Sequence, residues 1–382
     1  MFFYFHKITC KRRVVDISVL EVNICEMKEN LKSVKAKLLF GQKICFVVKA
    51  NGYGFGSKIC KFFQDEVDYF AVSSGYEFFE IEKLTNKPII ILDPIFNEKL
   101  LKKLISKGAE LTISNKESLQ KILNIEGLIK GEIKIHLAIN TGMNRFGISS
   151  ISSFCEMLEK IKKSHKIRIL GVFSHYFDGK CEKYSQNQLK KFIIYSNLLE
   201  KLLDKNIIKH ISATDGIIHN NYGDMVRIGY GIYDNNYFDT IKLKTKILDF
   251  QILKSGESAG YNSIFVAKKY TKIAVVGIGY GDGILRNIAG KGYCLIRDKF
   301  AKILAVCMDS MLVDVTEIDC KINDDVIIIG KSEKNKISIC DIASWCGTIG
   351  YEIIVRLSDR IKRVYLGDNK CKSLQESIVQ EN

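Results

Sequence analysis

One lysine in the sequence is placed where an amine could act as a nucleophile. Lys49 closes a short apolar run, Ile44–Lys49, which is typical of a buried strand, and a turn with Gly52, Gly54 and Gly56 follows it. Burial lowers the pKa of a lysine ammonium, and the neutral amine can form an imine with a carbonyl compound. The alternative is structural, because a lysine at a strand end can also extend its ammonium into solvent.

Polar side chains follow four further apolar runs at the points where the runs end. They are Asn140, Thr141 and Arg145 after one run, His175 and Thr214 after the next two, and Arg227 within or just after the last. A single histidine is more often a structural residue, and a single arginine is more often part of a surface ion pair. Five strand ends that carry such residues point to one site if the strands are parallel, because their carboxyl ends then meet at one edge.

The last of these segments is also suited to a phosphate. Arg227, Gly229 and Gly231 form a turn whose backbone N–H groups, together with the hydroxyl of Thr214, could bind an anion. A lysine that can form an imine, together with a phosphate site, suggests pyridoxal phosphate as the cofactor.

Eight apolar runs with helical stretches between them must position these side chains. The runs are Ile44–Lys49, Tyr69–Ser73, Pro88–Leu92, Glu110–Ser114, Lys134–Asn140, Ile167–His175, Ile208–Thr214 and Met225–Ile232. The alternation predicts an α/β fold, a TIM-like (β/α)8 barrel. A doubly wound open sheet is the alternative, although no Gly-x-Gly-x-x-Gly fingerprint follows the first strand. Before these runs, Leu20, Ile24, Met27 and Leu31 recur at helical spacing and predict a helix.

The pattern changes after a polar connector at 234–240. Strand-like runs then dominate, at Leu243–Leu253, Lys272–Ile278, Tyr293–Arg297, Ala301–Met308, Met311–Val315, Asp325–Ile329 and Lys362–Leu366, with one helix predicted at Ile339–Trp345. We therefore predict two domains, a barrel over residues 1–238 and a mostly β domain over residues 239–382.

The composition is that of a globular protein with a basic surface. The chain has 382 residues, of which 47% are hydrophobic and 26% charged, and its net charge is +15. Its lysines are spread along helical stretches such as Lys99–Lys107 and Lys160–Lys166. Because they are not clustered with groove-reading motifs, we expect a solvated lysine-rich surface and no nucleic-acid partner.

The cysteines and the N-terminal segment indicate a cytoplasmic protein. The 12 cysteines include no Cys-x-x-Cys pair, and several lie inside apolar runs, which favours reduced thiols over disulfides or a zinc site. The segment Met1–Lys7 has its apolar residues before its charge, the wrong order for a signal peptide. No apolar run approaches the length of a membrane span. We expect no metal site, no membrane association and a cytoplasmic location.

Seven segments of the chain resemble those of a single enzyme family. They are "VVKANGYGFG", "HLAINTGMNRFG", "VRIGYGIY", "AGYNSIFV", "IGYGDG", "VCMDSMLVDVT" and "GTIGYE". Taken in order from about Val14 to Leu366, they resemble the alanine racemase family of fold-type III pyridoxal-phosphate enzymes. The resemblance implies a homodimer with shared active sites that interconverts L- and D-alanine for peptidoglycan.

The resemblance also implies the two bases that racemisation needs on opposite faces of a planar intermediate. Lys49 would hold the cofactor and act on one face, and Tyr261, from a second copy of the chain, would act on the other. Arg145 would orient this tyrosine. Arg227, held by His175, would face the pyridine nitrogen; because arginine keeps its proton, the ring would stay neutral, which favours racemisation over decarboxylation.

The remaining implied roles concern the phosphate and the substrate. Those for the phosphate fall to Tyr53, Thr214, the backbone of Gly229 and Tyr230, and Tyr351. Met308, from the second copy, would contact the substrate carboxylate, and Tyr280 would line the entrance. Without the resemblance, Tyr261 would be taken for an ordinary packed tyrosine and Met308 for a core residue.

The chain departs from the family pattern near these residues. Phe55 replaces a histidine, Asn140 replaces an aspartate, and Ala138 stands where many members have a lysine that braces the arginine loop. These departures keep two alternatives open. One is a serine or broad-specificity amino-acid racemase, and the other is a non-catalytic pyridoxal-phosphate-binding protein.

Overall fold

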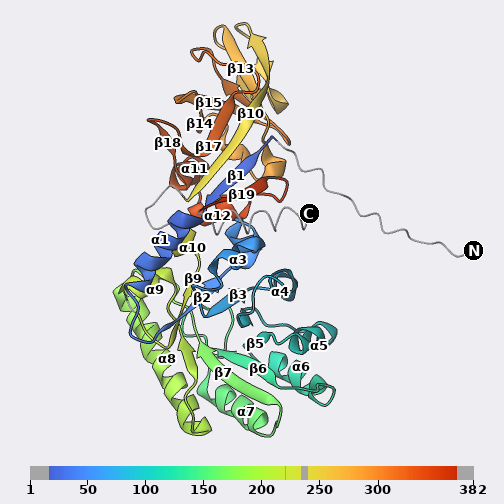
Figure 1. The fold of residues 1–382 in the computed structure, drawn as a ribbon, viewed down its shortest axis with the longest axis vertical. Helices are drawn as coiled ribbons and strands as arrows, with labels where there is room; N and C mark the ends of the chain where they lie inside the picture. The colour runs from blue at the N-terminus through green and yellow to red at the C-terminus, as the bar shows by residue number, and fades with distance from the viewer. Residues whose placement is uncertain (1–16, 220, 234–239, 368–382) are drawn as a thin grey trace, which may run out of the picture. The chain divides into compact units, whose positions relative to one another are not determined.

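The computed structural model describes residues 17–219, 221–233 and 240–367, and the chain divides into two compact units (Figure 1). Met27–Asn236 form one unit, and Met1–Glu26 together with Tyr237–Asn382 form the other.

The first unit contains a closed barrel of parallel strands. They are β2 (Lys43–Val47), β3 (Tyr69–Val72), β4 (Ile89–Ile91), β5 (Glu110–Ile113), β6 (Ile133–Ala138), β7 (Ile167–Phe173), β8 (Ile208–His210) and β9 (Met225–Ile228). They pair in the order β8-β7-β6-β5-β4-β3-β2-β9, and a parallel bridge between Ala213 and Arg227 joins the segment after β8 to β9. The predicted (β/α)8 barrel is confirmed.

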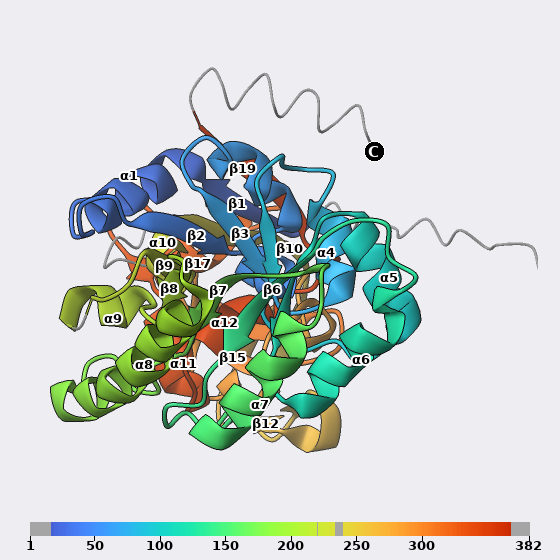
Figure 2. The same cartoon turned by 90° about the horizontal axis from the view of Figure 1, so that it is seen from below.

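Helices lie around the outside of these strands (Figure 2). They include α4 (Gly75–Ile81), α5 (Glu98–Ser106), α6 (Lys116–Glu126), α7 (Ile151–Lys162) and α8 (Glu182–Leu203). The unit also has the short segments α2 (Lys49–Tyr53), α3 (Cys60–Phe63), α9 (Thr214–His219) and α10 (Tyr230–Tyr233). Helices α4 to α7 are preceded by the N-cap residues Ser74, Asn97, Asn115 and Ser150, whose side chains accept N–H groups of the first turn. The starts of these four helices are therefore fixed by local hydrogen bonds.

Each predicted barrel strand is present, but every one ends earlier than predicted. Lys49 and Thr214, predicted as the last residues of strands, are the first residues of α2 and α9. The backbone hydrogen bonds between strands stop where the chain turns away from the sheet. Apolar residues continue past this point, so the length of an apolar run overestimates the length of the strand. The polar residues therefore lie just beyond the barrel strands.

The second unit is built on a nine-stranded sheet in the order β18-β17-β14-β15-β16-β13-β10-β1-β19. The strands are β1 (Val19–Asn23), β10 (Ile241–Leu253), β13 (Thr271–Val276), β14 (Tyr293–Ile296), β15 (Lys299–Val306), β16 (Met311–Asp314), β17 (Asp325–Lys331), β18 (Lys336–Ile337) and β19 (Lys362–Leu366). The unit also contains a small hairpin, β11 (Ser258–Ala259) with β12 (Phe265–Val266), and the helices α11 (Ile339–Cys346) and α12 (Gly350–Val355). The predicted mostly β character is confirmed.

The first strand of this unit corrects the prediction of a helix that includes Leu20. In β1, Leu20 and Val22 are buried while their neighbours are partly exposed, which is the period of two of a strand. β1 pairs antiparallel with β10 and parallel with β19. The helix, α1 (Ile24–Lys35), begins after β1 ends. The prediction placed residues 1–238 in the barrel, whereas β1 belongs to the sheet of the second unit.

Candidate active site

Lys49 stands at the start of an unusual left-handed turn directly after β2. Ala50, Asn51 and Gly52 have φ values of 52°, 53° and 59°, and Tyr53 follows with 54°. Non-glycine residues occupy this region at a cost and mostly where the surrounding structure holds them there. Here the Ala50 N–H donates to a Glu77 carboxylate oxygen at 2.8 Å. The lysine is therefore presented on a strained but braced segment.

The surroundings of Lys49 favour its neutral amine. Burial is the first cause that lowers the pKa of Lys49, and the positive charge of Arg145 is the second. Asp93 and Glu77 oppose this effect, while Arg227 adds to it. Within the part of the chain that the structure describes, the Lys49 ammonium has no hydrogen bond or ion pair. A partly buried amine without a partner is suited to nucleophilic attack on a carbonyl carbon.

Arg227 is fixed by acceptors at the ends of β7 and β8. The side chain is buried in β9, with Nη1 donating to the His210 carbonyl at 2.7 Å and Nη2 donating to the Ser174 carbonyl at 2.6 Å. Nη1 also lies 2.9 Å from Nδ1 of His210, and Nη2 lies 3.4 Å from Nδ1 of His175. Burial lowers the pKa of Arg227 to about 10, so the guanidinium remains charged near neutrality.

His175 lies just beyond β7 and is neutral in this setting. Burial is the first cause that lowers its pKa to about 3, followed by the charges of Arg227, Arg145 and Lys49. Its predicted contact with Arg227 is present only at the long distance of 3.4 Å. The shorter bonds of Arg227 go to Ser174 and His210.

Two glycines leave room for a small cradle between the end of β9 and the segments after β2 and β8. A Cβ on Gly229 would lie 2.5 Å from the hydroxyl oxygen of Tyr53, and a Cβ on Gly231 would lie 2.3 Å from Cγ2 of Thr214. The Gly231 N–H donates to the Thr214 hydroxyl at 3.3 Å. Only glycine allows these groups to approach so closely. The structure thus brings together Tyr53, Thr214 and the Gly229–Gly231 backbone.

Arg145 lies on an exposed loop that Asn140 organises. The Asn140 side-chain oxygen accepts the N–H groups of Gly142 and Asn144, both at 3.1 Å, and its amide donates to Asn144 and Ser149. The Arg145 guanidinium lies 5.0 Å from the ring centroid of Phe146. Ala138 is buried in β6. A neutral asparagine therefore shapes this loop, at the position where the family pattern has an aspartate.

The other predicted site residues belong to the second unit. Tyr261 begins a 3-10 turn, Tyr261–Ser263, and is 61% exposed. Met308 follows β15 and is 52% exposed, so it is not a core residue. It lies beside the turn Tyr280–Asp282, because the Gly281 N–H donates to the Met308 carbonyl at 2.8 Å. Tyr351 lies in α12 and is also exposed.

Sequence reasoning missed three buried polar residues behind Arg227. Glu110 of β5 lies 2.8 Å from His136 of β6, and His136 lies 3.0 Å from His210 of β8, which contacts Arg227. The available signal was the presence of Glu110 and His136 within otherwise apolar strands, where an unpaired polar group is costly.

Comparisons with known proteins assign both units to one family. The description "Alanine racemase, N-terminal domain" matches residues 22–236, and "Alanine racemase, C-terminal domain" matches residues 240–365. The alanine racemase of Thermodesulfovibrio yellowstonii is 31% identical over 363 residues, covering 91% of this chain and 97% of the relative. That of Clostridium kluyveri is 30% identical over 384 residues, covering 95% of this chain and 97% of the relative.

A solved structure agrees with these matches. The alanine racemase of Clostridium difficile 630 superposes with a TM-score of 0.85 at 28% identity, covering 94% of this chain and 97% of the other. In the described part of the chain, no helix has the length and apolar character that crossing a bilayer requires. The matched domains, the identity to curated relatives and the shared fold lead to one conclusion: the chain belongs to the alanine racemase family.

Proposed function

We propose that this chain interconverts L-alanine and D-alanine with pyridoxal phosphate as its cofactor. One observation carries the proposal most directly. Lys49 lies next to the C-terminal end of a barrel strand, its pKa is lowered by burial and by Arg145, and Arg227 adds to the same effect. The names of the relatives supply the substrate.

The residues present fit the cofactor. Lys49 supplies the amine for its aldehyde, and the hydroxyls of Tyr53 and Thr214 with the backbone of Gly229 and Tyr230 supply a phosphate cradle that a Cβ would fill. The bound cofactor would withdraw electrons from the α-carbon of the substrate. Tyr351 is proposed as a further phosphate ligand on the resemblance alone.

Arg227 is suited to the pyridine nitrogen. Its Nη1 and Nη2 groups are directed at acceptors of the protein, from Ser174, His175 and His210. The Nε–H is the donor that remains for a ligand, since no acceptor for it occurs among the described residues. A permanently charged donor would leave the ring nitrogen unprotonated, which moderates electron withdrawal and favours proton return over side reactions.

Two bases on opposite faces would exchange the α-proton. Lys49 is one, and Tyr261 is proposed as the other, supplied by a second copy of the chain in a homodimer. The exposure of Tyr261 and Met308 supports this proposal, because exposed apolar and aromatic groups are suited to meeting a partner. Arg145 would lower the pKa of the tyrosine by placing positive charge near it. Tyr280 and Met308 would border the substrate.

Racemisation of L-alanine by the purified protein tests the function. Conversion to D-alanine is expected when pyridoxal phosphate is added, with Lys49→Ala inactive and Tyr261→Phe strongly impaired in the removal of the proton from L-alanine. Tyr270→Phe is a control, because Tyr270 is similarly exposed but has no proposed role. Full activity of the Lys49→Ala protein would refute the mechanism.

A serine or broad-specificity racemase is the second candidate. This candidate is motivated by Phe55 and Ala138, two buried residues close to the proposed site that depart from the family pattern. Relative kcat/KM values for alanine, serine, lysine and arginine decide between them. A protein that binds the cofactor and racemises none of these would be a non-catalytic carrier. The supply of D-alanine for peptidoglycan and the cytoplasmic location follow from the first candidate.

A further inference from the structure

A continuous chain of hydrogen bonds crosses the interior of the barrel from Glu110 to Arg227. The Glu110 carboxylate lies 2.8 Å from Nε2 of His136, Nδ1 of His136 lies 3.0 Å from Nε2 of His210, and Nδ1 of His210 lies 2.9 Å from Nη1 of Arg227. All four residues are almost fully buried, with exposures of 3%, 0%, 0% and 5%. We call this chain the inner relay.

The direction of the inner relay follows from the chemistry of its two ends. Arginine can only donate, so Nδ1 of His210 must accept and its proton must lie on Nε2. That Nε2–H then donates to Nδ1 of His136, which in turn carries its proton on Nε2 and donates to Glu110. Only this arrangement of protons gives each of the three contacts one donor and one acceptor, and it requires a hydrogen-bond acceptor at position 110.

The barrel is shaped locally to accommodate the inner relay. The pairing of β6 with β7 shifts register between Ile135 and His136, and such irregularities redirect a side chain. Opposite this point lies Gly171, where a Cβ would be 2.6 Å from Nδ1 of His136. The ring of His210 stacks on Phe173 with centroids 5.0 Å apart. The absence of a side chain at Gly171 therefore makes room for the imidazole of His136 where it meets that of His210.

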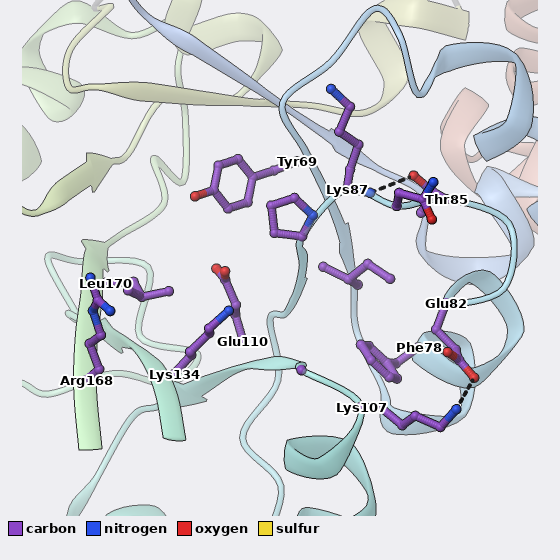
Figure 3. A pocket seen from close by; sticks show the side chains of 14 residues that line it. Tyr69, Phe78, Glu82, Thr85, Lys87, Lys107, Glu110, Lys134, Arg168 and Leu170 are labelled. Carbon is purple, nitrogen blue, oxygen red and sulfur yellow. Dashed lines mark hydrogen bonds and ion pairs between the residues drawn. The ribbon is translucent and has the colours of Figure 1, made fainter. Parts of the chain in front are cut away.

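The far end of the inner relay reaches a cavity of about 590 Å³ at the opposite, N-terminal ends of the strands. Figure 3 shows Glu110 among the side chains that line this cavity, which also include Tyr69, Lys134 and Arg168. The carboxylate therefore stands between the cavity and the barrel interior. Its charge is separated from that of Arg227 by two neutral rings.

We propose that Glu110 and His136 are positioning residues that act on the cofactor through His210 and Arg227. Glu110 supplies the carboxylate that balances the buried guanidinium, and His136 transmits a fixed hydrogen-bond direction. Together they hold the Arg227 side chain with its Nε–H available to the pyridine nitrogen. The effect on the cofactor rests on the proposed function, whereas the proton arrangement of the relay does not.

Selective labelling of the histidines with 15N tests the proton arrangement directly. The chain has six histidines, so His136 and His210 can be assigned through His136→Phe and His210→Phe variants. Neutral rings protonated on Nε2 are expected for both residues, in the protein with and without pyridoxal phosphate. A proton on Nδ1 of His210 in both forms, or a doubly protonated ring at pH 7, would overturn the inner relay whether or not the protein is a racemase.

Cofactor affinity tests the positioning role. Glu110→Gln keeps an acceptor but removes the charge, and Glu110→Leu removes both, so we expect pyridoxal phosphate to bind about 10-fold and about 100-fold more weakly, by analogy with the range found for residues that hydrogen-bond to metal ligands. His136→Phe should resemble Glu110→Leu if one variant fails to fold. Glu82→Gln is the matched control, because Glu82 lines the same cavity but is paired with Lys107. If wild type, Glu110→Gln and His136→Phe bind pyridoxal phosphate with equal affinity, Glu110 and His136 do not position Arg227 for the cofactor, and the proposal is wrong.

Discussion

The Glu77 carboxylate accepts the backbone N–H of Ala50, the residue directly after Lys49, at 2.8 Å. The same side chain accepts the N–H groups of Ser73 and Ser74 at 2.8 Å and 3.0 Å and completes a capping box at the start of α4. One carboxylate therefore links the start of a helix to the left-handed turn that presents the candidate nucleophile. Loss of the side chain releases both.

Glu77→Ala should weaken both the start of α4 and the turn after Lys49, whereas the loss of an ordinary helix cap should weaken a helix alone. We expect a loss of about 1–2 kcal/mol in the free energy of unfolding and slower covalent capture of pyridoxal phosphate by Lys49. Asn97→Ala removes the cap of α5, where the Asn97 side chain accepts the Leu100 N–H at 2.9 Å, and should lower stability by about 1 kcal/mol without changing capture. Urea unfolding and borohydride trapping measure the two quantities. Equal trapping rates for both variants would contradict the link.

The amine of Lys49 should react at lower pH than a solvated lysine. Its pKa is lowered, so it loses its proton earlier as pH rises, and trapping of pyridoxal phosphate on cofactor-free protein should reach its midpoint below the usual lysine pKa of about 10.4. Arg145→Gln should raise this midpoint, because Arg145 lowers the pKa. Asp93→Asn should lower it, because Asp93 raises the pKa. Shifts of the same sign in both variants would show that charge is not the cause.

Gly231→Ala should damage the proposed phosphate cradle. The added Cβ would meet Cγ2 of Thr214 at 2.3 Å, and overpacking of this kind costs about 1–3 kcal/mol, equivalent to roughly 5- to 160-fold in cofactor affinity if it falls on the bound state. Gly127→Ala is the control, since no atom lies within 4 Å of a Cβ there. Equilibrium titration with pyridoxal phosphate provides the affinities. An unchanged affinity in Gly231→Ala would place the phosphate elsewhere.

His175 should make the protein less stable in mild acid. Its pKa is about 3 in the folded chain and about 6.5 when unfolded, so the unfolded chain binds more protons between these values. The free energy of unfolding should therefore rise with pH from about 3 to 6.5, by at most about 1.4 kcal/mol per pH unit for this one group. His175→Gln should flatten the rise, as measured by urea unfolding at pH 5 and pH 7. An identical slope in the variant would refute the lowered pKa.

The barrel was predictable because its strands are short apolar runs at regular intervals. The position of Lys49 beside a strand end was predictable because it closes one of these runs, whereas its role stays a prediction. Strand ends were less accurate, as Thr214 shows, since an apolar run continues into the turn that ends a ladder. β1 was misassigned because Leu20 and Ile24 satisfy a helical spacing while Leu20 and Val22 satisfy that of a strand.

The inner relay could not be predicted from local pattern. Glu110, His136 and His210 lie on three strands, and each alone resembles an isolated polar residue in a core. Their meeting depends on the register shift at His136 and on the space left by Gly171, which are properties of strand pairing over long separations in sequence. The glycines after Lys49 predicted a turn. They did not predict that Ala50 and Asn51 would also adopt the left-handed conformation of Gly52.

The position of β1 between β10 and β19 has a consequence for synthesis of the chain. β1 leaves the ribosome before the other described strands, but Asn23 pairs with Leu366, on the order of 340 residues later. At roughly 5–20 residues per second, this strand must wait tens of seconds for its parallel neighbour, whereas the barrel can close well before then. A chain that stops short of β19 would expose one edge of β1 to other nascent chains. A strand made late thus protects one edge of a strand made early.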